Sequence, residues 1–341
     1  MRKIGDWLFS KFAKQEPSKL TPLSQTAFET PPVVRMIGKT DAEYDAQGGV
    51  YFPLRYLTDM MRFISQNSDC LQVLTYQDLD VRDGHEHANN YHAEYLAWNA
   101  RVAADPVANC KAHVLLQYDI DRSTDLMHAL LASPEHDKVP ANIMLFNERV
   151  DRWRLRSSGE LCTTEYPLDE ALLRRRQSEG FVIGYHTNAY ELGGHDTDRA
   201  LEIFDRDMTA MSEKYGTRFF SAHGGVPDAK GKNNNALPYH PDWIDRSIWV
   251  HNGVNLRFDG VFSDGGHNSP KRDPKNRDLR QFFETLQPGK RYRMLLHPQY
   301  YGDDYGVSRR FLGTPWYDDM IRTAQQQPER SLWENVKLNI K

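Results

Sequence analysis

The chain has 341 residues and a formal net charge of −4 at pH 7. A domain that binds nucleic acid is usually strongly basic, so this charge balance argues against a nucleic-acid partner. Hydrophobic residues make up 39% of the chain and charged residues 26%, which are ordinary values for a globular protein with a large core. The cysteines Cys70, Cys110 and Cys162 are far apart and form no C-x-x-C pair, which favours a reducing compartment over a disulfide framework or a zinc ribbon.

The first 50 residues have the composition of an extension or linker. Residues 1–14, MRKIGDWLFSKFAK, lack the apolar stretch and the cleavage site of a secretory signal. Their apolar side chains fall on one side of a short helix, which either packs on the body of the protein or makes peripheral contact with a membrane surface. We therefore expect a cytoplasmic protein, with association at the membrane as the alternative.

From residue 51 to about residue 300, short apolar runs alternate with helix-like stretches. The runs are LQVLTY (71–76), HVLLQYD (113–119), NIMLF (142–146), FVIGYH (181–186), RFFSAH (218–223), GVFSD (260–264) and YRMLLH (292–297). Two of the helix-like stretches end at Gly180 and Gly216, and glycine is typical of helix ends. Apolar runs with little internal alternation suit parallel strands covered on both faces. The pattern predicts an α/β fold, either a barrel or an open doubly wound sheet.

Five of these seven runs end in Asp or His. The residues at the run ends are Asp119 and Asp121, His186, His223, Asp264 and His297. In a parallel barrel, the carboxyl ends of all strands lie on one rim, where such proteins carry their active sites. One histidine at a strand end is commonly structural, but five such ends together predict a site that binds a metal or transfers protons.

The two aspartates after the second run need a counter-charge. Asp119 and Asp121 are two positions apart on a strand, so both side chains point to the same face. Like charges this close raise one pKa unless a cation lies between them. A divalent cation would remove the repulsion, with Asp121 and His186 as its first two ligands and Asp119 as the acceptor of a proton.

These motifs together resemble the polysaccharide deacetylase family, metal-dependent carbohydrate esterases with a distorted barrel of about seven βα units. YDIDRS (118–123) resembles the first family motif, T-F-D-D-G, and GYHTNAYE (184–191) resembles the second, H-[ST]-x-x-H. FFSAHGG (219–225), FSDGG (262–266) and LLHPQYY (295–301) follow in the order of the family. The resemblance implies a distorted (β/α)7 barrel of parallel strands over residues 51–305. Residues 1–50 would be an N-terminal extension, and residues 306–341 would pack on the barrel.

The sequence departs from the family pattern at one metal ligand. Tyr190 stands where the second ligand histidine is expected, four residues after His186. Either Glu191 or His223 then completes the site, and Glu191 is slightly preferred. Zinc is the expected ion, because a catalytic zinc site has three protein ligands and one open position.

The resemblance implies hydrolysis of an N-acetyl or O-acetyl group on an amino sugar or a polysaccharide precursor. A metal-bound water would be the nucleophile, Asp119 the base and His297 the acid that protonates the leaving group. Aromatic side chains stack on sugar rings, so we expect Tyr185, Tyr190 and Tyr300, together with Asp264, to contact an acetylated carbohydrate. The alternatives are hydrolysis of a non-sugar amide on the same fold and a catalytically inactive carbohydrate-binding protein.

Overall fold

The computed structural model describes residues 50–79, 91–122, 124–151, 154–155, 158–236, 256–266, 278–306, 311 and 313–340. Residues 1–14, for which the sequence offers contact with a membrane surface as an alternative, lie outside these ranges. Within them, no helix has both the length and the apolar character needed to cross a bilayer.

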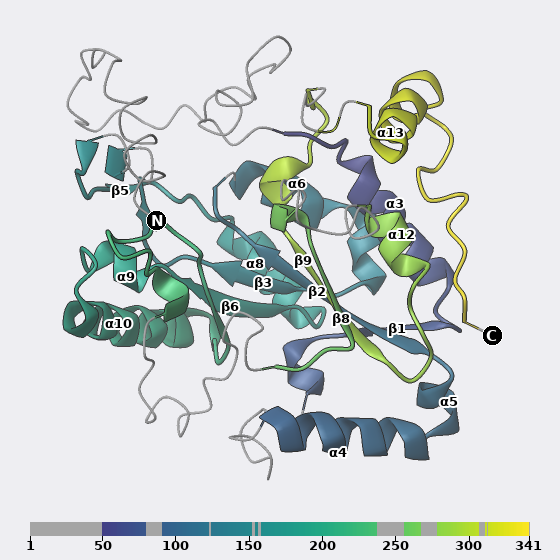
Figure 1. Ribbon diagram of the computed structural model, residues 1–341, viewed down its shortest axis with the longest axis horizontal. Coiled ribbons are helices and arrows are strands. Elements are labelled where there is room, and N and C mark those ends of the chain that lie inside the picture. The colour runs from purple at the N-terminus through teal and green to yellow at the C-terminus, as the bar shows by residue number, and fades with distance from the viewer. Residues whose placement is uncertain are drawn as a thin grey trace.

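One parallel sheet of seven strands organises the molecule (Figure 1). The strands are β1 (Leu71–Leu74), β2 (Ala112–Asp119), β3 (Asn142–Leu145), β6 (Val182–Thr187), β7 (Phe220–Ala222), β8 (Gly260–Ser263) and β9 (Arg291–Leu296). Each strand overlaps one of the seven apolar runs. The predicted α/β fold with parallel strands is therefore confirmed.

Strand β2 lies at the centre of the sheet and is buried along its whole length. The spatial order is β7-β6-β3-β2-β9-β8, and β1 also pairs with β2. On one edge of β2, β1 pairs with its first half and β3 with its last residues, from Gln117 to Asp119. On the other edge, β9 pairs with residues from His113 to Tyr118. Over the described residues no pairing joins β7 to β8, so the sheet is a curled half-barrel, a distorted form of the seven-unit barrel.

Helices cover the outer face of this sheet. They are α3 (Arg55–Gln66), α6 (Thr124–Ala132), α8 (Glu170–Ser178), α10 (Thr197–Tyr215), α12 (Leu279–Phe283) and α13 (Pro315–Gln326). Their apolar side chains form one large core with alternate residues of the strands, such as Val114, Leu116 and Tyr118 of β2. The helix α10 ends at Gly216, with φ 66°, and Gly180 follows α8, so the two predicted glycine ends are confirmed.

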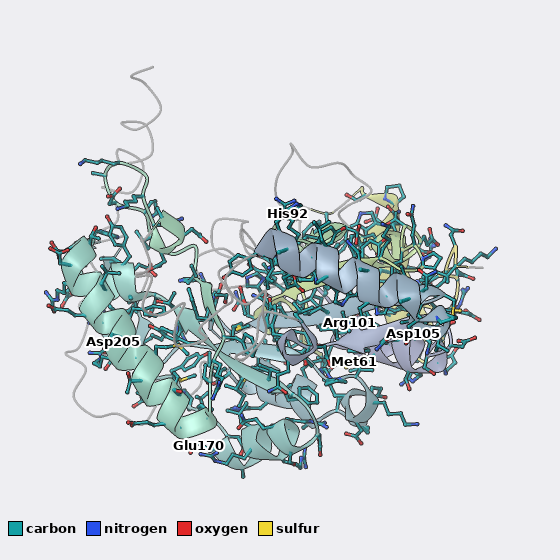
Figure 2. The ribbon with its side chains drawn as sticks, turned by 90° about the horizontal axis from the view of Figure 1, so that it is seen from below. Met61, His92, Arg101, Asp105, Glu170 and Asp205 are labelled. Atoms are coloured by element: carbon teal, nitrogen blue, oxygen red, sulfur yellow. The ribbon has the colours of Figure 1, made fainter. Side chains whose placement is uncertain are left out.

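The inner face of the curl carries a second, smaller core. Leu115, Met144 and Val182 meet there with Trp98 of α4 (Tyr91–Ala104). Seen from below, α4 runs across one end of the molecule, with His92 near its start and Arg101 near its end (Figure 2). Glu94 of α4 accepts two hydrogen bonds from Arg291 of β9, at 2.7 and 2.6 Å, and neither side chain is exposed. This ion pair ties α4 to the sheet.

Shorter elements connect these parts. They are α5 (Pro106–Asn109), α9 (Ala189–Leu192), η1 (Tyr76–Asp78), η2 (Pro134–Lys138), η3 (Asn234–Ala236), η4 (Asp264–Gly266), η6 (Pro298–Tyr300) and the hairpin of β4 (Arg149–Val150) and β5 (Thr163–Thr164).

The C-terminal segment lies on the outer core beside α3. The Tyr317 hydroxyl donates to the carbonyl of Tyr51 at 2.9 Å, and Trp333 Nε1 donates to the carbonyl of Tyr56 at 2.8 Å. The division of the chain at residues 50 and 305 stays a prediction.

Candidate metal centre and active site

The polar residues at the strand ends converge at one edge of the sheet. Asp119 is the last residue of β2, His186 lies in β6, and His223 directly follows β7. Asp264 follows β8 and His297 follows β9. Parallel pairing puts all these carboxyl ends on the same side, which is why residues far apart in the chain come together.

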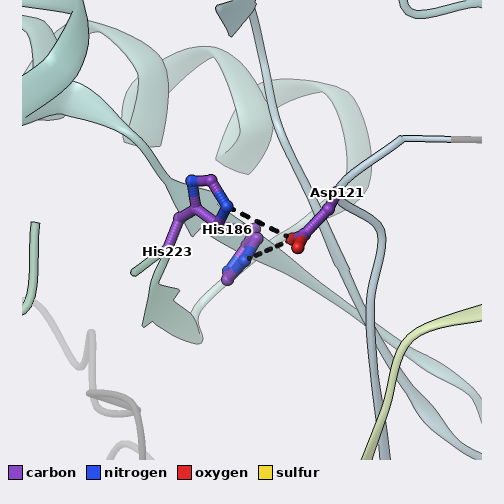
Figure 3. Close-up of side chains that lie close together, drawn as sticks. All are labelled: Asp121, His186 and His223. Carbon is purple, nitrogen blue, oxygen red and sulfur yellow. Dashed lines mark hydrogen bonds and ion pairs between the residues drawn. The ribbon is translucent and has the colours of Figure 1, made fainter. Parts of the chain in front are cut away.

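Asp121, His186 and His223 form a compact group of metal-ligand type (Figure 3). One donor atom from each residue lies within 4.8 Å of the other two, and all three residues are buried. Asp121 Oδ1 lies 3.2 Å from His186 Nε2 and 3.6 Å from His223 Nε2. Zinc ligands at about 2.0–2.2 Å in a tetrahedron lie roughly 3.3 Å from one another, so these separations fit such an ion.

Each histidine of the group is held by its other ring nitrogen. His186 Nδ1 makes a hydrogen bond of 2.8 Å with Ser221 Oγ, and His223 Nδ1 donates to Glu191 Oε2 at 3.2 Å. Because Nδ1 keeps its own partner, a metal ion can take the place of the Nε2 proton on the side of Asp121. Outer partners of this kind fix the tautomer and the ring orientation of metal-binding histidines.

Glu191 lies behind His223 and does not reach Asp121. Besides His223, its carboxylate accepts from the backbone N–H of Val226 at 2.6 Å and from Asn234 Nδ2 at 3.3 Å. A Cβ on Gly225 would lie 2.6 Å from both Asn234 Nδ2 and Glu191 Oε2, and its φ is +62°. Glycine at this position therefore lets the chain after β7 close over Glu191. Of the two candidates for the third ligand, the structure brings His223 to Asp121 and sets Glu191 one step farther out.

Asp119 and Asp121 have different surroundings although they share a face. Asp119 Oδ2 lies 3.7 Å from His186 Nε2, while its Oδ1 accepts from Gln117 Nε2 at 2.7 Å. Burial alone would raise the pKa of Asp121, but the charge of His223 and the hydrogen bonds of both histidines hold that pKa well below its usual range. Asp121 is thus kept as a carboxylate, the form that binds metals.

His297 forms a second pair with Asp264 beside this group. His297 Nδ1 donates to Asp264 Oδ1 at 2.5 Å, and Asp264 Oδ2 accepts from the backbone N–H of His297 at 2.6 Å. His297 Nε2 lies 3.8 Å from Asp121 Oδ2. Burial would lower the pKa of His297, but the charge and hydrogen bond of Asp264 outweigh it and raise the pKa to about 10. His297 therefore carries a proton at neutral pH on the side facing Asp121.

Aromatic rings form the apolar part of the site. The Phe146 ring lies 5.1 Å from the rings of both His186 and His223, and the Tyr300 ring lies 5.6 Å from that of His297. Phe146 ends the third apolar run, but the pattern of polar residues at run ends does not single it out, because its side chain is apolar. Burial raises the pKa of Tyr300 to about 12, so its hydroxyl stays protonated.

Three of the residues expected to contact a substrate have other partners. Tyr185 is 0% exposed and its hydroxyl donates to Asp207 at 3.0 Å, because it precedes His186 on β6 and points to the opposite face. Tyr190 donates to Asp228 at 3.0 Å. Asp264 is engaged by His297. The fourth residue with this predicted role, Tyr300, lies beside His297, with the two ring centroids 5.6 Å apart.

Solved structures similar to this chain include carbohydrate esterases. A family 4 carbohydrate esterase from Bacillus anthracis is 14% identical over 67% of this chain and 86% of that chain, with a TM-score of 0.29. For a peptidoglycan N-acetylglucosamine deacetylase, the identity is 15%, the coverage 64% and 83%, and the TM-score 0.27.

In structure, the chain is similar to CE4 carbohydrate esterases. One of them, a CE4 family pseudoenzyme from Bacillus anthracis, is 12% identical over 63% of this chain and 60% of its own length, with a TM-score of 0.30. A scan against protein-family models finds no match, and a search of the curated proteins finds none either.

Proposed function

We propose that this protein is a metal-dependent hydrolase that removes an acetyl group from an N- or O-acetylated carbohydrate. The observation that carries the proposal is the buried group of Asp121, His186 and His223, with a carboxylate and a protonated histidine beside it. Structural packing gives no reason to gather these five charged or titratable side chains at one edge of a sheet. A metal-dependent hydrolase uses groups of these kinds as metal ligands, general base and general acid.

The residues fit a divalent cation, and zinc fits best. One carboxylate oxygen and two imidazole nitrogens are a common catalytic donor set for zinc, and both imidazoles have the outer partners that such sites use. When bound, such an ion polarises an acyl oxygen and lowers the pKa of a coordinated water toward neutrality. The carboxylate of Asp121 is the residue that would anchor it.

Asp119 is suited to accept a proton. Its carboxylate is buried at 3% exposure, and Oδ2 faces the same space as His186 Nε2. His297 is suited to donate one, because Asp264 keeps it protonated at neutral pH. A base on one side and an acid on the other are what hydrolysis of an amide or ester requires, since the nucleophile loses a proton and the leaving group gains one.

The carbohydrate part of the proposal rests on the sequence motifs and on the aromatic rings. Tyr300 offers a flat apolar face next to His297, and sugar rings stack on such faces. Phe146 packs against the rings of both histidines and adds apolar surface beside the candidate metal ligands. The expected substrate is an acetylated amino sugar or a polysaccharide precursor.

Metal analysis combined with acetate release tests the proposal. We expect purified protein to bind one divalent cation per chain and to release acetate from acetylated amino sugars, and a chelator to abolish the release. Asp121→Ala should lose the metal and the activity, whereas Asp303→Ala, which removes an exposed carboxylate, should keep both. Stoichiometric metal without release from any acetylated sugar would favour a binding protein. Release that persists in metal-free protein would refute the metal-dependent mechanism.

A further inference from the structure

The geometry points to Gln117 and Tyr76 as a hydrogen-bonded pair that orients Asp119 for proton transfer. The inference rests on the proposed function, and it adds two positioning residues on the inner face of the sheet, beneath Asp121, His186 and His223, which we call the metal group. Both residues lie in the predicted apolar runs but outside the motifs that resemble the family.

The pair is connected to Asp119 without interruption. The Tyr76 hydroxyl donates to Gln117 Oε1, and Gln117 Nε2 donates to Asp119 Oδ1 at 2.7 Å. Gln117 and Asp119 are two positions apart on β2, so both side chains point to the inner face. The hydroxyl sets the direction of the amide, because Oε1 is the atom that can accept from it and Nε2 is then the atom left for Asp119.

Tyr76 is itself held from two sides. Its backbone N–H donates to Asn142 Oδ1 on the neighbouring strand β3 at 2.9 Å, and its ring stacks on Phe219 with centroids 5.6 Å apart. Burial raises the pKa of Tyr76 to about 12, so the hydroxyl keeps its proton and acts as a donor. Tyr76 and Gln117 are both 0% exposed, and solvent does not compete for these bonds.

This arrangement gives the two oxygens of Asp119 different tasks. Oδ1 is occupied by the Gln117 amide, while Oδ2 faces His186 and the space beside the metal group. A carboxylate fixed in one orientation presents the same oxygen at every turnover. A misplacement of about 1 Å in such a group can cost roughly a hundredfold in rate.

Two substitutions on the pair and one matched control test the inference. Gln117→Met keeps the length of the side chain and removes the amide, and Tyr76→Phe removes only the hydroxyl. Tyr118→Phe is the control, because Tyr118 is an equally buried tyrosine on β2 that points to the outer face and bonds His136 at 3.0 Å. All three should lose a similar amount of thermal stability.

The readouts separate positioning from packing. For metal-loaded protein acting on an acetyl ester such as p-nitrophenyl acetate, we expect Gln117→Met to lower kcat by roughly tenfold to a hundredfold with KM and metal affinity unchanged. Tyr76→Phe should lower kcat less, and Tyr118→Phe should not lower it. A crystal structure of Gln117→Met should show the Asp119 carboxylate rotated or in two conformers.

Two results would overturn the inference: an ordered, unmoved Asp119 carboxylate in Gln117→Met, or an equal loss of kcat in Tyr118→Phe and Tyr76→Phe. If the wild-type protein turns over no acetyl ester or amide at all, the proposed function fails instead. The crystal structure then still decides whether Gln117 orients Asp119, so the two failures are distinguishable.

Discussion

His223 Nε2 lies 3.6 Å from Asp121 Oδ1, although the two residues follow different strands of the sheet. Strands β7 and β2 are separated by β6 and β3, and the curl of the sheet brings their ends together. The third residue of the candidate metal group is thus supplied by a neighbouring strand end and not by the helical turn after His186. Tyr190, in that turn, bonds to Asp228.

The Glu191 carboxylate should strengthen metal binding without touching the metal. Glu191→Gln removes the charge that holds the Nδ1 proton of His223, so metal affinity should fall by about 10- to 100-fold. His223→Ala should weaken binding more. Competition with a chromophoric chelator measures the metal affinity of both variants. Glu148→Gln, which changes an exposed carboxylate, is the control. An unchanged affinity in Glu191→Gln would show that His223 is oriented by other groups.

Asp119→Asn should separate metal binding from hydrolysis. Asparagine keeps the shape of the side chain but is not a base, so acetate release should fall by roughly a hundredfold or more while the bound metal is retained. Asp121→Asn should lose both properties. Elemental analysis and an acetate assay on the same samples compare metal content with activity. Full activity in Asp119→Asn would exclude Asp119 as the base.

Asp264→Asn should shift the pH dependence of hydrolysis. His297 must be protonated to donate, so activity is lost as the pH rises through the pKa of this residue, which is about 10 with Asp264 in place. Without the Asp264 charge, burial dominates and the pKa falls, so the basic limb of the kcat/KM profile should move to lower pH. A profile that keeps its basic limb would mean that His297 is not the acid.

The pair of His297 and Asp264 also makes the stability of the fold depend on pH. The folded-state pKa of His297 lies above the ordinary value of 6.5. Its protonation therefore stabilises the fold fully below about pH 6.5, and this contribution is lost as the pH rises through about 10. Thermal unfolding of the wild type between these values should show the decline, and Asp264→Asn should show less of it.

Gly225→Ala should disturb the metal group through Glu191. Gly225 and Gly194 have nearly the same φ, +62° and +65°, but a Cβ meets Glu191 and Asn234 only at Gly225, while at Gly194 nothing lies within 4 Å. Both alanine variants carry the cost of the left-handed backbone. We expect only Gly225→Ala to lose metal affinity as well, which chelator competition measures. Equal affinities in the two variants would refute the role of this glycine.

The buried pair of Arg291 and Glu94 should matter far more for stability than an exposed pair. Glu94→Ala leaves an uncompensated charge in the core and should destabilise the protein by about 3–5 kcal/mol. The exposed pair of Arg322 and Asp319 is the control, and Asp319→Ala should cost less than about 1 kcal/mol. Denaturant unfolding gives both values. Similar losses would indicate that α4 is held to the sheet by its apolar contacts.

The sequence is informative about this fold because the strands are short, apolar and buried on both faces. That pattern locates all seven strands and the polar residue at the end of five of them. The strand order cannot be obtained in this way, since β1 and β3 share one edge of β2 and the half-barrel stays open between β7 and β8 over the described residues.

The surroundings of a site residue can be predicted from the sequence only where the local pattern determines them. The exclusion of Tyr185 follows from strand alternation once His186 faces the site, so the sequence contains that signal. The choice between Glu191 and His223 depends on how the chain after β7 folds back, which is a tertiary property. The hydrogen bond between Gln117 and Tyr76 is also a tertiary property. It forms only because β1 and β2 lie side by side, which the sequence of either run does not show.

The division of one edge of β2 between two partners has a consequence for local unfolding. β1 has four residues and pairs only with the first half of β2, whereas the half that ends in Asp119 is held by β3 and β9. Opening of β1 by thermal motion would therefore leave the backbone beneath Asp119 hydrogen-bonded on both edges. Amides of a short strand with one neighbour exchange with solvent sooner than those of a doubly paired segment, so the amides of β1 should exchange before those at the end of β2.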